Sequence, residues 1–265
     1  MRMWSQNLVA LVQFFASSNL VLTLDESCST AVRPDGVKIV ADVEELLTRN
    51  EMGEISGLSF PDRIIVTANH QGMQFFDFIF LKRKLALDKE NIVSNLTRTK
   101  KSGNPLWLVL FPEGTGLHLC TLTLDDSVEW LYDFTIGYPG VRTDENPEDV
   151  YNISKIFFLG QNPKQIHIHI RRFKVSDIPK DAEEFSQWVH QRWIEKDLLM
   201  TQFYKDGRFA GQDYEQTEKM NSARTFEIPI KLKNSVIDLA QPYVFLLSYI
   251  PLVKMAKSVL CRFIA

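Results

Sequence analysis

Ile64-Ile65-Val66-Thr67-Ala68 is an apolar run that leads directly into the polar triplet Asn69-His70-Gln71. A second pair repeats this arrangement, because Leu106-Trp107-Leu108-Val109-Leu110 leads into Phe111-Pro112-Glu113-Gly114-Thr115. Short apolar runs bounded by turn residues are typical of strands buried in a sheet. An α/β fold places its chemistry where such strands end, since side chains there reach a crevice while the sheet holds them in place. The sequence therefore predicts two buried strands, each followed by a polar motif.

Further elements are predicted on both sides of these strands. Residues 165–171 alternate strictly between isoleucines and the polar residues His167, His169 and Arg171, as expected for a strand. Asp181-Ala182-Glu183-Glu184 resembles a capping box that opens a long helix, and Gly207 is a stop signal for it. Other strands are predicted over 20–24 and 130–137, and other helices over 40–49 and 72–87. Alternating strands and helices indicate an α/β fold with a mixed sheet flanked by helices in a single domain.

Composition excludes several classes of protein. The chain has 265 residues, of which 45% are hydrophobic, and its mean hydropathy of -0.12 argues against a polytopic membrane protein. The net charge of -3 argues against a nucleic-acid partner. The three cysteines, Cys28, Cys120 and Cys261, are widely spaced and odd in number, which favours reduced thiols facing the cytosol over a disulfide framework.

Both ends of the chain are candidates for membrane association. Residues 3–24 contain no charged side chain and are long enough to span a bilayer, but their polar residues make an interfacial helix equally plausible. A cleaved signal peptide is a third reading. From Lys219 onward the sequence contains seven basic and two acidic residues. This excess of positive charge suits an anionic membrane surface or, alternatively, an ordinary solvated helix. We therefore divide the chain into a membrane-associating segment 1–24, an α/β domain 25–210 and a basic, apolar, membrane-associating tail 211–265.

Taken together and in this order, the two polar motifs resemble those of the phospholipid/glycerol acyltransferase superfamily. The family signatures are an Asn-His-x₄-Asp block and a Phe-Pro-Glu-Gly-Thr block, and the run from Gly72 to Arg83 is similar to the motif between them. The sequences of residues 128–138, 169–178 and 193–200 are similar to those of the eukaryotic enzymes that acylate lysophosphatidic acid and lysophosphatidylinositol. The resemblance covers residues 62 to about 209.

The resemblance assigns roles to particular residues. Acyl transfer to an alcohol needs a base for the hydroxyl proton, and His70 is the histidine that a motif places beside a strand end. Arg83 would hold the phosphate of the acceptor, because a guanidinium matches phosphate oxygens. Glu113, Gly114 and Thr115 would shape the acceptor site. The structural alternatives are a histidine that caps the next helix, a surface arginine and an ordinary glycine turn.

The chain departs from the family pattern at two places. The acid partner of the family's histidine stands five positions after it, where this chain has Phe75, and Asp77 is about 10.5 Å along a helix axis from His70. After Thr115, the family continues with a further strand-forming block, whereas this chain runs straight into Gly116. We therefore interpret the chain as shortened after Gln71 and after Thr115.

These observations predict an acyl-CoA-dependent lysophospholipid acyltransferase in phospholipid biosynthesis, whose acceptor is lysophosphatidic acid or lysophosphatidylinositol. The alternative is a catalytically inactive, membrane-bound, shortened relative. We expect acyl-CoA, a lysophospholipid and the bilayer as partners, and the endoplasmic reticulum membrane as the location, with the catalytic domain in the cytosol. No cofactor or metal is implied, since His167 and His169 have no cysteine or carboxylate at ligand spacing. A serine hydrolase is excluded because the sequence has no Gly-x-Ser-x-Gly elbow.

Overall fold

The computed structural model of the chain describes residues 9, 12–14, 16–32, 38–40, 43–69, 85–110, 114–152, 154–209 and 224–232. The chain forms two compact units. The larger comprises Leu20–Asn152 and Gln165–Ile228, and the smaller comprises Met1–Asn19, Ile153–Lys164 and Pro229–Ala265. The predicted division at residues 24 and 210 stays a prediction, because the structure describes only part of segment 1–24 and residues 224–232 of the tail.

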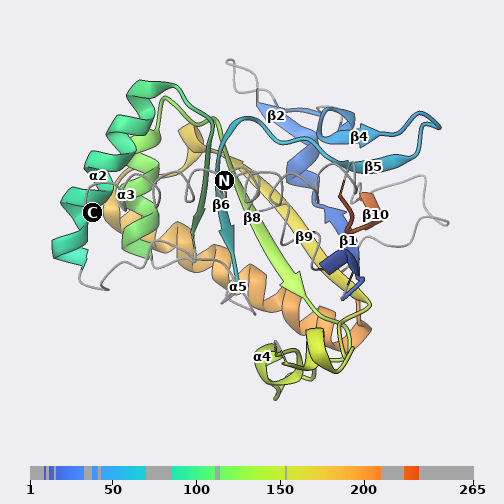
Figure 1. Cartoon of the computed structure of the whole chain (residues 1–265). Coiled ribbons are helices and arrows are strands. Elements are labelled where there is room, and N and C mark those ends of the chain that lie inside the picture. The colour runs from blue at the N-terminus through green and yellow to red at the C-terminus, as the bar shows by residue number, and fades with distance from the viewer. Residues whose placement is uncertain are drawn as a thin grey trace, which may run out of the picture. The chain divides into compact units, whose positions relative to one another are not determined.

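A six-stranded mixed sheet forms the centre of the larger unit, with the strand order β10-β1-β9-β8-β6-β7 (Figure 1). Strand β6 lies between β7 and β8 and runs parallel to both, while β9 runs antiparallel to β8. These elements confirm the predicted α/β class. The strands are β1 (Asn19–Leu24), β6 (Arg63–Ala68), β7 (Leu106–Leu110), β8 (Trp130–Gly137), β9 (Gln165–Lys174) and β10 (Arg224–Pro229).

Three helices cover one face of this sheet, namely α2 (Leu85–Ser102), α3 (Gly114–Leu124) and α5 (Ala182–Asp206). Their apolar side chains pack against Ile65 and Leu131 in one buried cluster. Helix α5 begins where the Asp181 carboxylate accepts hydrogen bonds from the backbone N–H groups of Glu183 and Glu184, at 2.9 and 3.1 Å. It ends at Gly207, whose φ of 70° is left-handed. The predicted capping and stop signals of this helix are therefore confirmed.

Among the described residues, the other face of the sheet packs against irregular chain and short strand pairs rather than long helices. Leu22, Leu24, Ile64, Val66 and Ile170 form its buried cluster with residues from the segment 28–58. That segment contains the antiparallel pairs β2–β3 and β4–β5, which Figure 1 shows beside the sheet. The strands are β2 (Thr30–Val32), β3 (Lys38–Val40), β4 (Leu47–Arg49) and β5 (Ile55–Leu58). Short 3₁₀ turns cover Glu26–Ser29, Val43–Leu46 and Val175–Asp177, α4 covers Pro147–Val150 and a π-helical turn covers Ser154–Phe158.

Arg63, at the start of β6, links three connections at the amino-terminal ends of β6, β7 and β8 by hydrogen bonds. Its Nε donates to the Ser127 carbonyl oxygen at 2.9 Å, and its Nη1 donates to the carbonyl oxygens of Thr99 and Asn104. These acceptors belong to the ends of α2 and α3 and to the chain that enters β7, so one side chain fixes three connections.

Two predictions of local structure were wrong. A helix was predicted over 40–49, but the chain forms the 3₁₀ turn Val43–Leu46 and then β4, because Leu47 and Thr48 pair with Leu58 and Gly57 of β5. The predicted helix 72–87 was ended too early, because α2 continues to Ser102, with Ile92 and Leu96 packed on the core. Residues 70–84, which hold most of the predicted helix 72–87, lie outside the described residues.

Candidate active site

The two polar motifs follow neighbouring parallel strands. In the register of β6 with β7, Thr67 lies opposite Leu110, so the chain leaves both strands at the same level of the same sheet edge. His70 and Glu113 each follow this pair by three residues in the sequence. Three residues span at most about 10 Å, so the register limits how far either residue lies from its strand end. The prediction that a strand precedes each motif is confirmed, and β6 is buried as predicted, whereas β7 is a half-buried edge strand on which Trp107 is 53% exposed.

Most of the predicted site residues lie outside the part of the chain that the structure describes. This holds for His70, Phe75, Arg83 and Glu113. Gly114 and Thr115 are the first two residues of α3, which begins at the end of β7. The amino-terminal end of a helix presents unpaired backbone N–H groups and a positive dipole end, which favour a phosphate or a developing negative charge nearby.

Asn69, directly before His70, is held by the backbone of the neighbouring strand. Its Nδ2 donates to the Ile136 carbonyl oxygen at 2.9 Å, and its Oδ1 accepts from the Ile136 N–H at 2.7 Å. The Asn69 side chain is buried, so both bonds are shielded from water. This pair fixes the point at which the chain leaves β6, so Asn69 is a positioning residue, a role that the Asn-His motif alone did not indicate.

A buried cluster of charges lies beneath the same strands, between the sheet and α5. Asp133 of β8 accepts from Arg171 Nη2 and from Lys196 Nζ, each at 2.6 Å, and from Thr67 Oγ1 at 2.8 Å. Arg171 also reaches Glu195 at 2.6 Å. Burial raises the pKa of Asp133, but Lys196 and Arg171 together outweigh it and hold the pKa below its usual range. Asp133 is therefore ionised, and its oxygens are already occupied by these donors.

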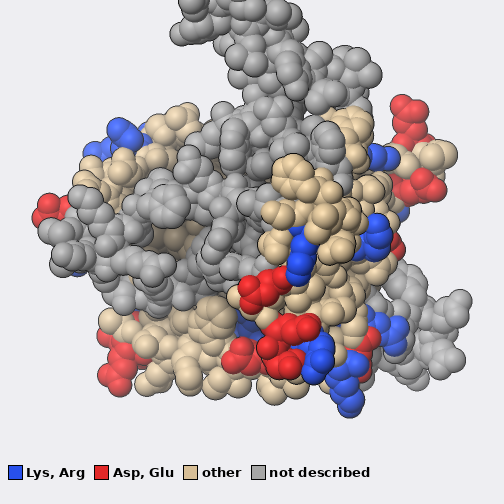
Figure 2. Space-filling model, turned by 60° about the horizontal axis from the view of Figure 1, so that its bottom comes forward, with Lys and Arg blue, Asp and Glu red and all other residues tan. Residues whose placement is uncertain are grey.

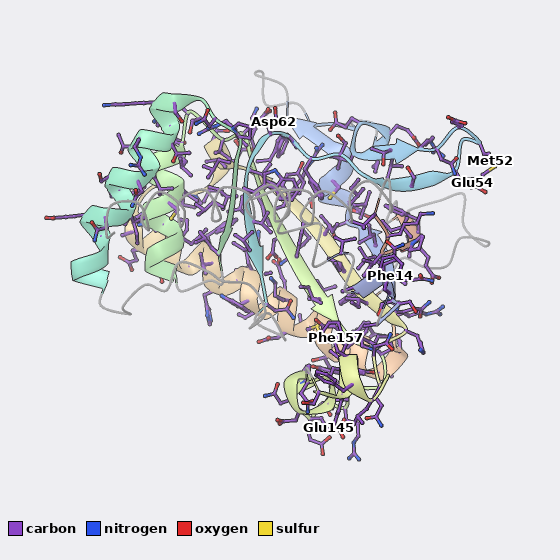
Figure 3. The ribbon with its side chains drawn as sticks, in the orientation of Figure 1. Phe14, Met52, Glu54, Asp62, Glu145 and Phe157 are labelled. Carbon is purple, nitrogen blue, oxygen red and sulfur yellow. The ribbon has the colours of Figure 1, made fainter. Side chains whose placement is uncertain are left out.

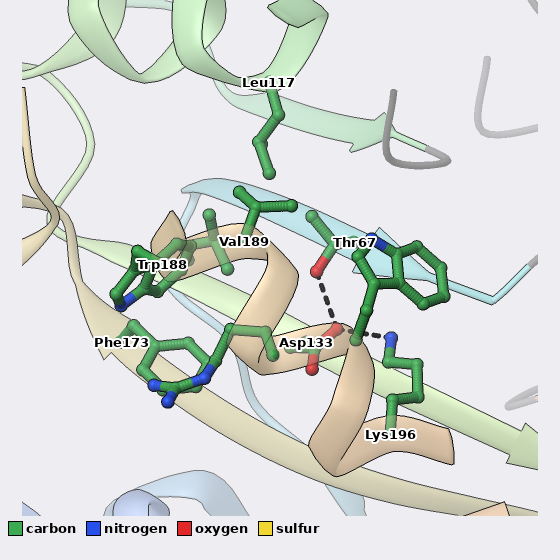
Figure 4. Close-up of a pocket in the computed structure, with 10 residues that line it drawn as sticks. Thr67, Leu117, Asp133, Phe173, Trp188, Val189 and Lys196 are labelled. Carbon is green, nitrogen blue, oxygen red and sulfur yellow. Dashed lines mark hydrogen bonds and ion pairs between the residues drawn. The ribbon is translucent and has the colours of Figure 1, made fainter. Parts of the chain in front are cut away.

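A small cavity adjoins this charge cluster, as Figure 4 shows. Its volume of about 20 Å³ has room for about one water molecule and none for an acyl chain. Thr67, Asp133 and Lys196 line one side, and Leu117, Trp188 and Val189 line the other. The ion pairs of the charge cluster therefore hold α5 on the sheet, and the cavity beside them is too small for an acyl chain.

Two further histidines face α5 from β9. His167 lies opposite Gly137, at the same sheet edge as the motifs, and its ring is 5.3 Å from that of Phe203. His169 lies 3.6 Å from the Asp25 carboxylate and 5.5 Å from the Phe209 ring. Burial lowers the pKa of both imidazoles, to about 4 for His169, where it outweighs the opposing effect of Asp25. Both rings are neutral at pH 7, and they are only 4% exposed, which leaves no access for a substrate.

The described cysteines do not provide a nucleophile. Cys28 and Cys120 are both buried, and burial raises their pKa values to about 12 and about 11. Because the thiolate is the reactive form, neither side chain is suited to carry an acyl group at neutral pH. Among the residues described, no group of three or more histidine, cysteine or acidic side chains is arranged to hold a metal ion.

Comparison with known proteins agrees with the motifs. A family model described as "Acyltransferase C-terminus" matches residues 157–231. The 2-acyl-1-lysophosphatidylinositol acyltransferase of Saccharomyces cerevisiae is 47% identical over 106 residues, which are 40% of this chain and 27% of that protein. A probable 1-acyl-sn-glycerol-3-phosphate acyltransferase of Arabidopsis thaliana is 25% identical over 257 residues, covering 77% of this chain and 66% of the relative. The chain is thus similar to members of the glycerophospholipid acyltransferase family over part of its length.

The similar acyltransferases differ in their named acceptors. A lysocardiolipin acyltransferase of Gallus gallus is 26% identical over 169 residues, which are 51% of this chain and 43% of that protein. The chain thus spans between about a quarter and two thirds of the length of these three relatives. No solved structure gives a significant match. Within the described residues, no helix is both long and apolar enough to cross a bilayer.

Proposed function

We propose that this chain transfers a fatty acyl group from acyl-CoA to the free hydroxyl of a lysophospholipid. The observation that carries the proposal is the parallel pairing of β6 and β7, which brings the strands of the Asn-His and Phe-Pro-Glu-Gly-Thr motifs side by side. Names of relatives that act on lysophosphatidylinositol and on acylglycerol phosphate support lysophosphatidylinositol or lysophosphatidic acid as the acceptor.

The proposed chemistry needs one base and no resident cofactor. His70 accepts the proton of the acceptor hydroxyl, whose oxygen attacks the thioester carbonyl carbon. The tetrahedral intermediate collapses, the carbon–sulfur bond breaks, and coenzyme A leaves as a thiolate that takes up a proton. Arg83 holds the acceptor phosphate, and Glu113, Gly114 and Thr115 shape the acceptor site, where the amino-terminal end of α3 adds backbone N–H groups. The proposed location is the endoplasmic reticulum membrane, with this domain on the cytosolic side.

An inactive relative is the second candidate, and Phe75 is the observation that favours it. The family's acid partner would stabilise the imidazolium form of His70, and a phenyl ring offers no charge for this. Asp133 does not replace that acid, because Arg171 and Lys196 already bind its carboxylate.

The test is acyl transfer from labelled oleoyl-CoA in membranes that contain this chain, with lysophosphatidic acid, lysophosphatidylinositol and lysophosphatidylglycerol as acceptors. We expect His70→Ala to abolish the transfer and His190→Ala to leave it unchanged, because His190 is an exposed residue of α5. Equal transfer by wild type and His70→Ala, with both proteins present at equal amounts, would leave the inactive relative as the correct reading.

A further inference from the structure

An exposed apolar turn stands out in the smaller unit. The single π-helical turn Ser154–Phe158 is followed by Leu159 and Gly160. Phe158 is 80% exposed and Leu159 is 64% exposed, and the two are consecutive in the sequence. Scattered exposed apolar side chains are ordinary, but adjacent large ones at a turn mark an interaction surface.

The backbone of this turn is already hydrogen-bonded within itself. The Leu159 N–H donates to the Ser154 carbonyl oxygen at 3.2 Å, and the Gln161 N–H donates to the Lys155 carbonyl oxygen at 2.9 Å. Gly160 has a φ of 64°, which allows the chain to reverse at the tip. An apolar medium penalises unpaired backbone groups, so internal pairing is what a turn needs to enter such a medium.

The turn is also anchored to the end of the amino-terminal apolar segment. Asn162 Nδ2 donates to the Ser17 carbonyl oxygen at 2.9 Å, and Ser18 Oγ donates to the Pro163 carbonyl oxygen at 2.6 Å. The Asn19 N–H donates to the Lys164 carbonyl oxygen at 2.9 Å. The same unit contains Phe14, which is 54% exposed. Figure 3 labels Phe14 and Phe157, which belong to these two segments. The chain just after the turn is therefore hydrogen-bonded to residues 17–19 of the predicted membrane-associating segment 1–24.

The charge around the turn indicates the kind of partner. Residues 154–164 include Lys155 and Lys164 and contain no acidic residue. The acidic residues that precede the turn in the sequence, Asp144, Glu145, Glu148 and Asp149, belong to the larger unit. Figure 2 shows acidic and basic side chains interspersed on the face turned forward. An apolar tip flanked by lysines fits the headgroup region of an anionic bilayer, where the lysines meet phosphates and the apolar side chains lie below them.

We propose that the turn 154–160 docks on an anionic phospholipid surface, with Phe158 and Leu159 inserted at the boundary between headgroups and acyl chains. This deepens the proposed function, because a lysophospholipid acceptor itself resides in a bilayer. The proposal makes this turn a membrane contact separate from the two ends of the chain.

A fluorescent label at the tip tests the proposal locally. Phe158→Cys in a Cys261→Ser background is labelled with an environment-sensitive nitrobenzoxadiazole maleimide. Cys28 and Cys120 are buried and resist this reagent at neutral pH. The control label is at Met52→Cys, which is 79% exposed at the tip of the β4–β5 pair. We expect vesicles of phosphatidylcholine with phosphatidylinositol to shift the emission of the label at 158 to shorter wavelength and to leave that of the label at 52 unchanged.

Charge substitutions provide a second readout. We expect Phe158→Asp with Leu159→Asp to weaken binding to the same vesicles by about tenfold or more, because two large apolar side chains are lost. Leu198→Asp is the matched control, since Leu198 is 65% exposed on α5. Unchanged emission at 158 on protein that sediments with the vesicles would overturn the proposal. A shift that appears without lipid and rises with protein concentration would also overturn it, in favour of contact between copies of the chain.

The same samples separate this proposal from the proposed function. Vesicle binding is measured without acyl-CoA, so docking with no acyl transfer would contradict the activity alone. Acyl transfer by a chain whose label at 158 stays unchanged on vesicles would contradict the docking alone.

Discussion

Asn69 is the residue through which the fold controls the predicted catalytic motif. Asn69→Leu keeps the approximate size of the side chain but leaves the Ile136 N–H and carbonyl groups buried without their partner. We expect the free energy of unfolding to fall by about 2 kcal/mol or more, and acyl transfer to fall with it.

Urea denaturation followed by circular dichroism measures this loss. Asn95→Leu is the control, because Asn95 is exposed on α2 and bonds there within its own helix, so its change should stay within about 0.5 kcal/mol. An Asn69→Leu protein with the same urea midpoint as wild type would show that the pair with Ile136 contributes nothing.

Asp133 supports a second prediction, because two buried cations depend on it. Asp133→Ala leaves Arg171 and Lys196 near each other without a counter-charge, and we expect a loss of about 3–5 kcal/mol. Adding Lys196→Met should recover part of this loss, so the double variant should cost less than the sum of the two single changes. Asp125→Ala is the control, since its partner Lys180 is 57% exposed and such pairs contribute less than about 1 kcal/mol. Additive losses in thermal denaturation would contradict the coupling.

The sequence predicts which residues of β9 share a face, but it does not predict their charged partners on β8 and α5. Strict alternation in 165–171 places His167, His169 and Arg171 on one face; His167 and Arg171 contact α5, and His169 contacts Phe209 just beyond its end. The partners Asp133 and Lys196 are 63 residues apart, and a lysine in a helix looks like a surface residue until the sheet is present. The same holds for Asn69 and Ile136, whose bonds join elements 67 residues apart.

The contact between β8 and α5 depends on a glycine. A Cβ added at Gly137 would lie 2.7 to 2.9 Å from the ring carbons of Phe203, which is closer than real Cβ contacts. We expect Gly137→Ala to cost about 1–3 kcal/mol, because the helix must move away from the strand. Replacing Phe203 by Leu in the same protein should recover part of the loss.

Gly116→Ala is the matched control for this prediction. A Cβ there meets no heavy atom within 4 Å, and the residue is inside α3, where alanine is favoured over glycine by up to about 1 kcal/mol. We expect this protein to melt at or above the wild-type temperature. Equal melting temperatures for the two glycine variants would show that the β8–α5 contact has room for a methyl group.

Elements were predictable where burial leaves a pattern in the sequence. Strand β6 is buried between its parallel neighbours β7 and β8, and its centre, Ile64 to Val66, is a continuous apolar run. Most of helix α2 escaped prediction because many of its residues are charged or polar, and its contacts with the core come from only a few residues, such as Ile92 and Leu96. The 3₁₀ turn at Val43–Leu46 has helix-like composition, but pairing with β5 decides the structure that follows it.

The whole molecule should be sensitive to mild acid. In the unfolded chain the imidazoles of His167 and His169 bind protons below about pH 6.5, whereas burial lowers their pKa values in the folded chain, to about 4 for His169. Between these values the unfolded state holds more protons, so stability falls as pH falls. For His169 alone we expect a loss of about 2 kcal/mol between pH 7.5 and pH 5. The pKa of Asp133 is also lowered, but its contribution is lost only below the usual aspartate range.

Urea midpoints at several pH values measure this effect. The double variant His167→Gln with His169→Gln should lose most of the dependence between pH 6.5 and pH 4, whatever its stability at pH 7.5. His190→Gln should retain it, because that imidazole is exposed. If the urea midpoint of the double variant falls with decreasing pH as steeply as that of wild type, groups other than His167 and His169 cause the acid sensitivity.

Arg63 divides the larger unit into a fixed end and a variable end. Because one guanidinium joins the connections at Thr99, Asn104 and Ser127, changes in the length of those loops would break several hydrogen bonds at once. The chain leaves β6 and β7 at the carboxyl-terminal ends of these strands, where Arg63 makes no hydrogen bond. Insertions, deletions and transplanted loops should therefore be tolerated there while the frame keeps its shape. At that end the chain is held by the pair of hydrogen bonds between Asn69 and Ile136, so the chain beyond residue 69 can change in length without breaking the bonds of Arg63.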